Sequence, residues 1–172
     1  MAGSLIKIQE TTVSSAVSSV TLTGIDSTYD VYMVKYNNVT GTIDNQGFRT
    51  RVTVSGTPDS TANYDVAYKR LRTDTTFSNI SATNETTITL GVVGTGTGEI
   101  NNGVLYLFNF NNASEYSFVT MEPTILDNSA LLQANTGGFV NTVAQSCDGI
   151  NFHLNSGNIQ TGSQFVLYGL KK

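Results

Sequence analysis

The sequence predicts an all-β protein built from about 8 to 10 antiparallel strands. Apolar and polar residues alternate with a period of two along most of the chain, as expected for strands that bury one face. Turn-forming residues interrupt this alternation about every 8 to 15 residues, a spacing typical of β-sandwiches and barrels. Charged residues make up only 13% of the chain, which contains 16 Gly and 2 Pro. This composition argues against long helices and against a charged, disordered chain.

The first third of the chain shows the alternation most clearly. Strands are predicted over residues 6–9, 19–23, 30–36 and 48–54. In the last of these, Phe48 and Val52 face one way, whereas Arg49 and Arg51 face the other. This segment is therefore expected to bury one face and to expose the other.

Six further strands are predicted from the same alternation. They cover residues 87–93, 104–110, 116–121, 138–143, 150–154 and 163–170. Residues 64–71 fit a short helical stripe as well as a strand, and we favour the strand. Residues 128–134 fit either one helical turn or a strand, and the sequence does not decide between them.

The chain of 172 residues is long enough to bury a single hydrophobic core. No Pro-rich linker, composition shift or block of charge divides it, so we predict one domain over residues 1–172. Residues 94–98 (GTGTG) form the one low-complexity patch. A phosphate-binding glycine loop needs a following helix N-terminus. A strand pattern follows here, so we predict a hairpin loop.

The charge balance limits the classes of partner. Nine Lys and Arg residues against thirteen Asp and Glu residues give a net charge of −4, so nucleic acid is not an expected partner. The first ten residues show neither the basic nor the apolar region of a secretory signal peptide. No apolar run approaches the ~20 residues that span a bilayer, so no membrane partner is expected.

Nothing in the sequence predicts a catalytic, cofactor or metal site. Cys147 and His153 are the sole residues of their types, too few for a zinc site or for a thiol protease dyad with a spare partner. We expect His153 on the polar face of a strand and Cys147 as an inert thiol. The carboxylates that might form an acid–base pair lie mostly in turn-like contexts: Asp59, Asp65, Asp74, Glu85, Glu99, Glu115 and Glu122. Residues 26–30 and 148–151 lack the acidic spacing of a calcium loop, so we interpret them as turns.

A contact surface for an acidic neighbour is one hypothesis for the basic residues. They concentrate at Arg49, Arg51, Lys69, Arg70 and Arg72. A solvated face is the alternative. Because Lys, Pro and bulges normally protect sheet edges and this chain has few basic residues and 2 Pro, we also expect neighbouring subunits to cover its edges.

Several runs resemble the small virion structural proteins of tailed bacteriophages. They include residues 102–118 (NGVLYLFNFNNASEYSF), 137–138 (GG), 148–152 (DGINF) and 157–171 (GNIQTGSQFVLYGLK). The last run resembles the usual ending of that group, a Gly-Ser or Gly-Thr turn that leads into Phe-x-Leu-Tyr-Gly-Ile/Leu-Lys. Residues 6–51, with 21–32 (TLTGIDSTYDVY), resemble the same group.

This resemblance implies a jelly-roll-like β-sandwich that commonly forms a homotrimer and has no enzymatic activity. The implied role is a capsid decoration or cement protein on the outer head surface, with the major capsid protein as partner. A tail-fibre or tail-tip subunit that binds a receptor or a host-surface glycan is the alternative. The implied location is the virion, assembled in the host cytoplasm. Phe165 and Leu167 are expected to face the core, and Gly169 is expected to permit close backbone approach.

Overall fold

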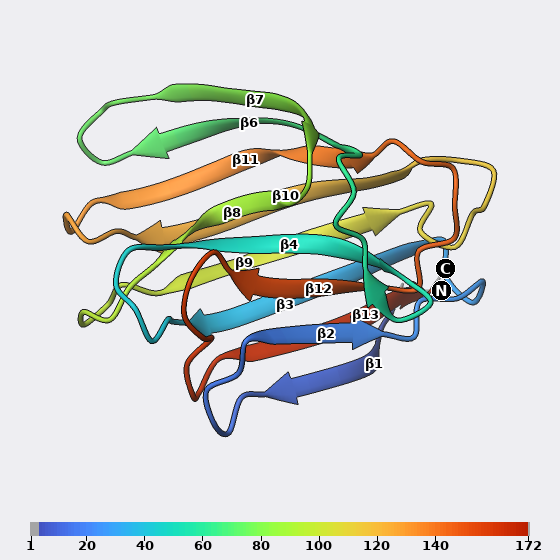
Figure 1. Ribbon diagram of the computed structural model, residues 1–172, viewed down its shortest axis with the longest axis horizontal. Coiled ribbons are helices and arrows are strands. Elements are labelled where there is room, and N and C mark those ends of the chain that lie inside the picture. The colour runs from blue at the N-terminus through green and yellow to red at the C-terminus, as the bar shows by residue number, and fades with distance from the viewer. Residues whose placement is uncertain (1–3, 172) are drawn as a thin grey trace.

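The computed structural model describes residues 4–171, and these contain only strands, turns and loops. Two antiparallel sheets pack face to face (Figure 1), so the predicted all-β antiparallel sandwich is confirmed. The strands are β1 (Ser4–Thr12), β2 (Ser19–Thr23), β3 (Val31–Val39), β4 (Gln46–Val54), β5 (Thr57–Pro58), β6 (Tyr64–Arg72), β7 (Ser78–Glu85), β8 (Ile88–Val93), β9 (Asn101–Phe108), β10 (Ser117–Leu126), β11 (Leu132–Asn141), β12 (Gly149–Leu154) and β13 (Gln164–Lys171). No helix in this part of the chain is long and apolar enough to cross a membrane.

The two sheets differ in size. The larger has eight strands in the order β1-β13-β3-β9-β10-β11-β6-β7. The smaller has the order β2-β12-β4, and the far edge of β4 pairs with β8 along one stretch and with β5 along another. Figure 1 shows β2, β12 and β4 in front of the larger sheet, with β6 and β7 extending beyond them.

Eight of the strands pair in a nested pattern. β1 pairs with β13, β2 with β12, β3 with β9, and β4 with β8. The chain segments between these strands supply the rest: β5, β6 and β7 lie between β4 and β8, and β10 and β11 lie between β9 and β12. We call β10, β11, β6 and β7 the extension, because they continue the larger sheet beyond β9.

An aromatic cluster fills the centre between the sheets. Phe152 and Phe165 have ring centroids 5.0 Å apart, and Tyr36 and Phe48 have centroids 5.2 Å apart with edge-on geometry. Phe165 and Leu167 are fully buried, which confirms their predicted orientation. Such pairs add directional stabilisation to the large apolar area that each ring removes from water.

The structure resolves the two ambiguous segments. Residues 64–71 lie in β6, as predicted. Residues 128–134 divide into a turn and the start of β11, and the Asp127 carboxylate accepts hydrogen bonds from the backbone amides of Ser129 and Leu131. An Asp side chain that bonds the backbone two residues later stabilises a turn rather than a helix.

Three sequence predictions differ from the structure. Residues 4–171 form thirteen strands rather than about 8 to 10, and the two that no predicted segment covers are β5, which has two residues, and the polar β7, which lacks a clear apolar face. Residues 94–98 are not a hairpin loop, since they lead from β8 in the smaller sheet to β9 in the larger. The close neighbour of Gly169 is a side chain: a Cβ there would lie 2.2 Å from the Tyr29 ring.

Candidate assembly surface

The larger sheet has an outer face that the smaller sheet does not cover. In β3, Tyr32, Val34 and Tyr36 are buried between the sheets, so alternation directs Val31 and Met33 to the opposite side. The same holds in β9, where Leu105 and Leu107 are buried. We call this side the outer face of the larger sheet.

Apolar side chains dominate the central strands of the outer face of the larger sheet, from β13 to β10. The strand register aligns three rows across it: Val31, Phe108, Phe118 and Val140; Tyr168, Met33, Tyr106 and Thr120; and Val166, Lys35, Val104 and Glu122. Leu5 and Leu170 add a further apolar pair on β1 and β13. Antiparallel sheets that face water on one side normally carry polar residues there, so this face has the composition of a buried surface.

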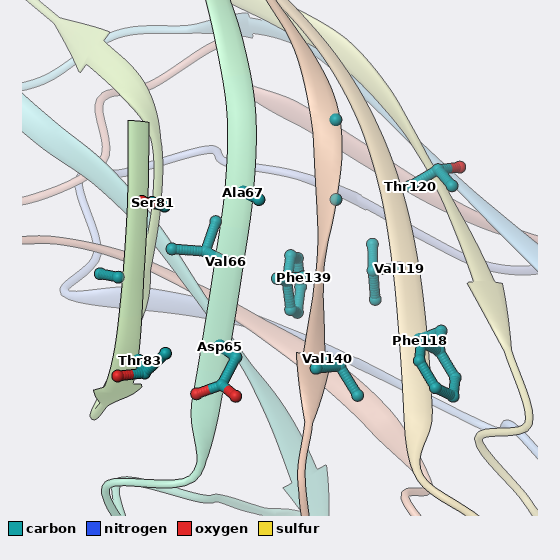
Figure 2. Close-up of a pocket in the computed structure, with 13 residues that line it drawn as sticks. Asp65, Val66, Ala67, Ser81, Thr83, Phe118, Val119, Thr120, Phe139 and Val140 are labelled. Atoms are coloured by element: carbon teal, nitrogen blue, oxygen red, sulfur yellow. The ribbon is translucent and has the colours of Figure 1, made fainter. Parts of the chain in front are cut away.

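An open groove lies on the part of this face that the extension forms. Figure 2 shows its lining side chains, which come from β10, β11, β6 and β7. Its volume is about 810 Å³, and its lining residues are Asp65, Val66, Ala67, Ser81, Ala82, Thr83, Phe118, Val119, Thr120, Gly137, Gly138, Phe139 and Val140.

Small residues create this groove. Gly138 lies between Thr120 and Ala67 in the strand register, and Ala67 lies next to Ser81. A Cβ at Gly138 would lie 2.4 Å from the carbonyl oxygen of Val119, so the close backbone approach requires glycine. This row of small residues forms the floor of the groove. Phe118, whose side chain is 47% exposed, lies beside it.

Few charges interrupt the centre of the outer face. Of the outward positions on β13, β3, β9 and β10, only Lys35 and Glu122 carry charge, and Val104 lies between them. Their charges are opposite. A surface with balanced charge and apolar rows is suited to contact with another protein, including a second copy of itself.

The area of this face is sufficient for a stable contact. Eight strands about 4.8 Å apart, with about 3.3 Å per residue, span roughly 1,000 Å². A specific interface needs about 800 Å² from each partner. Contiguous apolar patches beyond a few hundred Å² are rare on monomers and mark contact surfaces.

The five predicted patch residues lie on three different surfaces. Arg49 and Arg51 alternate with buried Phe48, Thr50 and Val52, so they lie on the outer face of the smaller sheet. Lys69 lies on the outer face of the larger sheet, as its place between Ala67 and Leu71 on β6 requires. Arg70 and Arg72 lie on the opposite side of β6, where Arg72 contacts Asp74 at 3.5 Å and Asp127 at 3.6 Å.

Several of the candidate acid–base and metal-binding carboxylates take part in local hydrogen bonding. Burial would raise the pKa of Asp59, but hydrogen bonds from Thr61, Gln145 and Asn141 lower it overall. The Asp148 carboxylate accepts hydrogen bonds from the Thr53 hydroxyl and the Gly56 amide. Within residues 4–171, no group of three or more His, Cys, Asp or Glu side chains could hold a metal ion.

Two further carboxylates and the single cysteine also have local roles. The Asp26 carboxylate accepts hydrogen bonds from the Thr28 amide and the Tyr32 hydroxyl, as in a turn. The Glu99 carboxylate accepts a hydrogen bond from the backbone amide of Gly96, so this donor of the glycine loop is bonded within the chain. Cys147 is fully buried, and its burial raises the pKa of the thiol, which is unfavourable for a nucleophile.

The alternation alone did not separate core from outer face in the central strands. Residues 31–34 (VYMV), 104–108 (VLYLF) and 165–168 (FVLY) are apolar at every position. Near-continuous apolar runs are typical of strands that are covered on both faces. This composition was the available indication that the larger sheet has a second apolar face.

Comparison with protein-family models, with curated proteins and with solved structures gives no match to this chain.

Proposed function

We propose that this chain is a non-enzymatic structural subunit of a bacteriophage virion, a decoration or cement protein on the outer head surface. The observation that carries this proposal is the apolar outer face of the larger sheet. Its aromatic and aliphatic rows lie on β13, β3, β9 and β10, about half of the roughly 1,000 Å² that the strand spacing gives for the whole face, and contiguous apolar patches of this size mark contact surfaces. The resemblance of residues 102–118 and 157–171 to phage virion proteins supports a virion as the class of assembly.

We infer that the eight nested strands form a jelly roll. When a long hairpin is rolled into two sheets, its first strand pairs with its last, its second with its second-last, and so on inward. The pairs β1–β13, β2–β12, β3–β9 and β4–β8 follow this pattern. Jelly rolls occur in viral capsid and lectin domains. The extension then enlarges the sheet that carries the apolar face.

The chemistry of the titratable groups supports a non-enzymatic role. A general acid or base acts best when its pKa lies near the working pH. His153 has a pKa of about 4, and the hydrogen bonds on Asp59 and Asp127 lower the pKa of each carboxyl overall, although burial alone would raise it. None of these shifts moves a group toward neutral pH.

The partners in this proposal are further copies of the chain, as a homotrimer, and the major capsid protein. In a closed ring of three copies, the outer face of the larger sheet of each copy would contact a different surface of its neighbour. Many such contacts around a shell would stabilise it without a single strong binding site.

Cryo-electron microscopy of the intact virion, with the subunit located by fitting this structure, tests the proposal. The expected result is density for this fold at repeated positions on the outer head surface. Density confined to the tail would overturn the decoration role in favour of a tail-fibre or tail-tip subunit. Absence of the chain from purified virions would overturn both roles.

A further inference from the structure

The outer face of the smaller sheet brings together two arginines and the sole histidine of the chain. Arg49 and Arg51 project from β4 about 7 Å apart, the spacing of alternate residues in a strand. His153 on β12 lies directly across from Arg49, and Asn151 lies directly across from Arg51. These four side chains, which we call the Arg–His cluster, come from two segments about 100 residues apart in sequence.

The arginines lack a counter-charge. Among residues 4–171, the ion pairs involve Lys7 and Arg72, not Arg49 or Arg51. Arg51 uses its Nε to donate to the carbonyl oxygen of Thr86 at 2.9 Å. The Nε of Arg49 is shielded from solvent and has no hydrogen-bond partner in the described part of the chain. A guanidinium donor that is shielded and unpaired is unfavourable unless an acceptor binds to it.

The surroundings of His153 are polar and carry no negative charge. Asn151 donates through its Nδ2 to the Thr21 hydroxyl, so its Oδ1 is free to accept from Nδ1 of His153, 3.2 Å away. The Thr87 hydroxyl lies 3.4 Å from Nε2. Burial, followed by the charges of Arg51 and Arg49, lowers the pKa of His153 to about 4, with no carboxylate among the causes. The imidazole is therefore neutral at neutral pH.

We propose that the Arg–His cluster binds the carboxylate of an acidic saccharide. The planar fork of a guanidinium matches a carboxylate in a bidentate arrangement. The Nε of Arg51 already donates to Thr86 and that of Arg49 is shielded from solvent, so the terminal amino groups of the two arginines are the donors that remain for a ligand. This site lies on the opposite side of the sandwich from the assembly surface.

The neighbouring side chains favour a saccharide over a protein segment. Ser19 lies next to His153 in the strand register, Thr21 next to Asn151, and Thr89 next to Arg49. Hydroxyl and amide groups of this kind hydrogen-bond to sugar hydroxyls. Protein interfaces are instead centred on apolar or aromatic anchors, which these outward positions lack.

Titration of the single histidine of the untagged chain by NMR tests the proposal, because the imidazole lies within the site. The probe is trigalacturonic acid, and its fully methyl-esterified form is the neutral control. Binding of the acid should raise the pKa of His153 by about 1, because a nearby carboxylate offsets the two arginines. The ester should leave this pKa unchanged.

Three variants identify the residues. R49Q and R51Q should each weaken trigalacturonic acid binding by about tenfold or more, the loss expected for a charge-assisted donor. K69Q is the matched control, since it removes the same charge from the other side of the sandwich, and its affinity should equal that of the wild type. R49Q and R51Q each raise the pKa of His153 in the free protein, whereas K69Q leaves it unchanged. The quantity compared between variants is therefore the further change in this pKa when ligand is added.

Four outcomes would overturn the proposal. They are the absence of a saturable change with trigalacturonic acid, an unchanged affinity in R49Q, equal binding of sodium sulfate alone, and equal or tighter binding of a hexaglutamate peptide. The third would indicate a site for any small oxyanion, and the fourth a site for an acidic protein segment. None of them depends on where the chain lies in a virion, so this test and that of the structural role can fail separately.

Discussion

The two outer faces of the sandwich have opposite chemistry. The outer face of the larger sheet is built from rows such as Val31, Phe108 and Phe118, with one Lys and one Glu near its centre. The outer face of the smaller sheet carries Arg49, Arg51 and hydroxyl and amide side chains. Both faces are outward in the isolated chain, yet only the polar one is suited to remain in water. Under the proposed function, the difference predicts which side another protein covers and which side meets solvent or ligand.

The largest expected effect is on assembly, through Phe118→Asp. This variant places a charge in the apolar rows and should weaken self-association by about 100-fold or more, because a charge buried in an interface without a partner is strongly unfavourable. Sedimentation velocity across a concentration series measures the change. Ile43→Asp is the matched control, since Ile43 is 45% exposed, close to the 47% of Phe118, but lies in the loop before β4.

Two outcomes would contradict this prediction about self-association. If the wild-type chain remains monomeric at about 100 μM, far above the ~1 μM affinity that corresponds to about 8 kcal/mol, the larger sheet does not bind a second copy. Equal association of the Ile43 and Phe118 variants would likewise remove the distinction between the outer face and the rest of the surface.

The second prediction concerns the groove on the larger sheet. Gly138→Ala should destabilise the fold by about 2 kcal/mol, because its new Cβ would lie 2.4 Å from the Val119 carbonyl oxygen and overpacking costs about 1–3 kcal/mol. Gly47→Ala, in β4, is the control: its Cβ would first meet the Asn155 side chain at 3.3 Å. Urea unfolding of both variants gives the comparison, and equal midpoints would contradict the close backbone approach.

The third prediction is a pH dependence that arises from the smaller sheet. The unfolded chain protonates His153 near its ordinary pKa of 6.5, whereas the folded chain does so only near pH 4. Stability should therefore fall as the pH decreases from about 6.5 to about 4, by roughly 1–2 kcal/mol after allowance for solvent screening. Urea unfolding at several pH values measures this slope.

His153→Gln is the control for this slope and should remove it. The carboxyls of Asp59 and Asp127, whose folded pKa values are lowered overall by hydrogen bonding despite burial, lose their contribution at lower pH, below their ordinary value of 3.8. A slope between pH 6.5 and 4 that persists in the His153 variant would show that another group causes it.

The smallest expected effect compares one threonine from each outer face. Thr21→Val removes the hydroxyl that accepts a 2.9 Å hydrogen bond from Asn151 and should cost about 1 kcal/mol. Thr120→Val, on the larger sheet, should leave stability within about 0.5 kcal/mol, the usual range for surface positions, because the described residues give Thr120 no side-chain hydrogen bond. Thermal unfolding checks both, and a larger loss at Thr120 would contradict the contrast.

Local pattern was sufficient for most strands but not for the pairing between them. The alternation in residues 48–54 correctly placed Arg49 and Arg51 on one face, because side-chain direction in a strand depends only on a period of two. It did not reveal the polar strand β7, whose sequence SNISATNE has one large apolar residue. That strand is defined by its pairing with β6, a tertiary contact.

The sequence by itself determined that this chain forms an antiparallel β-sandwich with a scarcity of charge, since alternation, turn residues and composition are local properties. Only the tertiary structure decided that the extension continues one sheet, that the apolar runs form one continuous outer face, and that Arg49 and His153 are neighbours. Register joins strands that are distant in sequence, such as β4 with β12 and β1 with β13. A single strand contains no information on which partner it will meet, so the two faces could be assigned only from the assembled sheets.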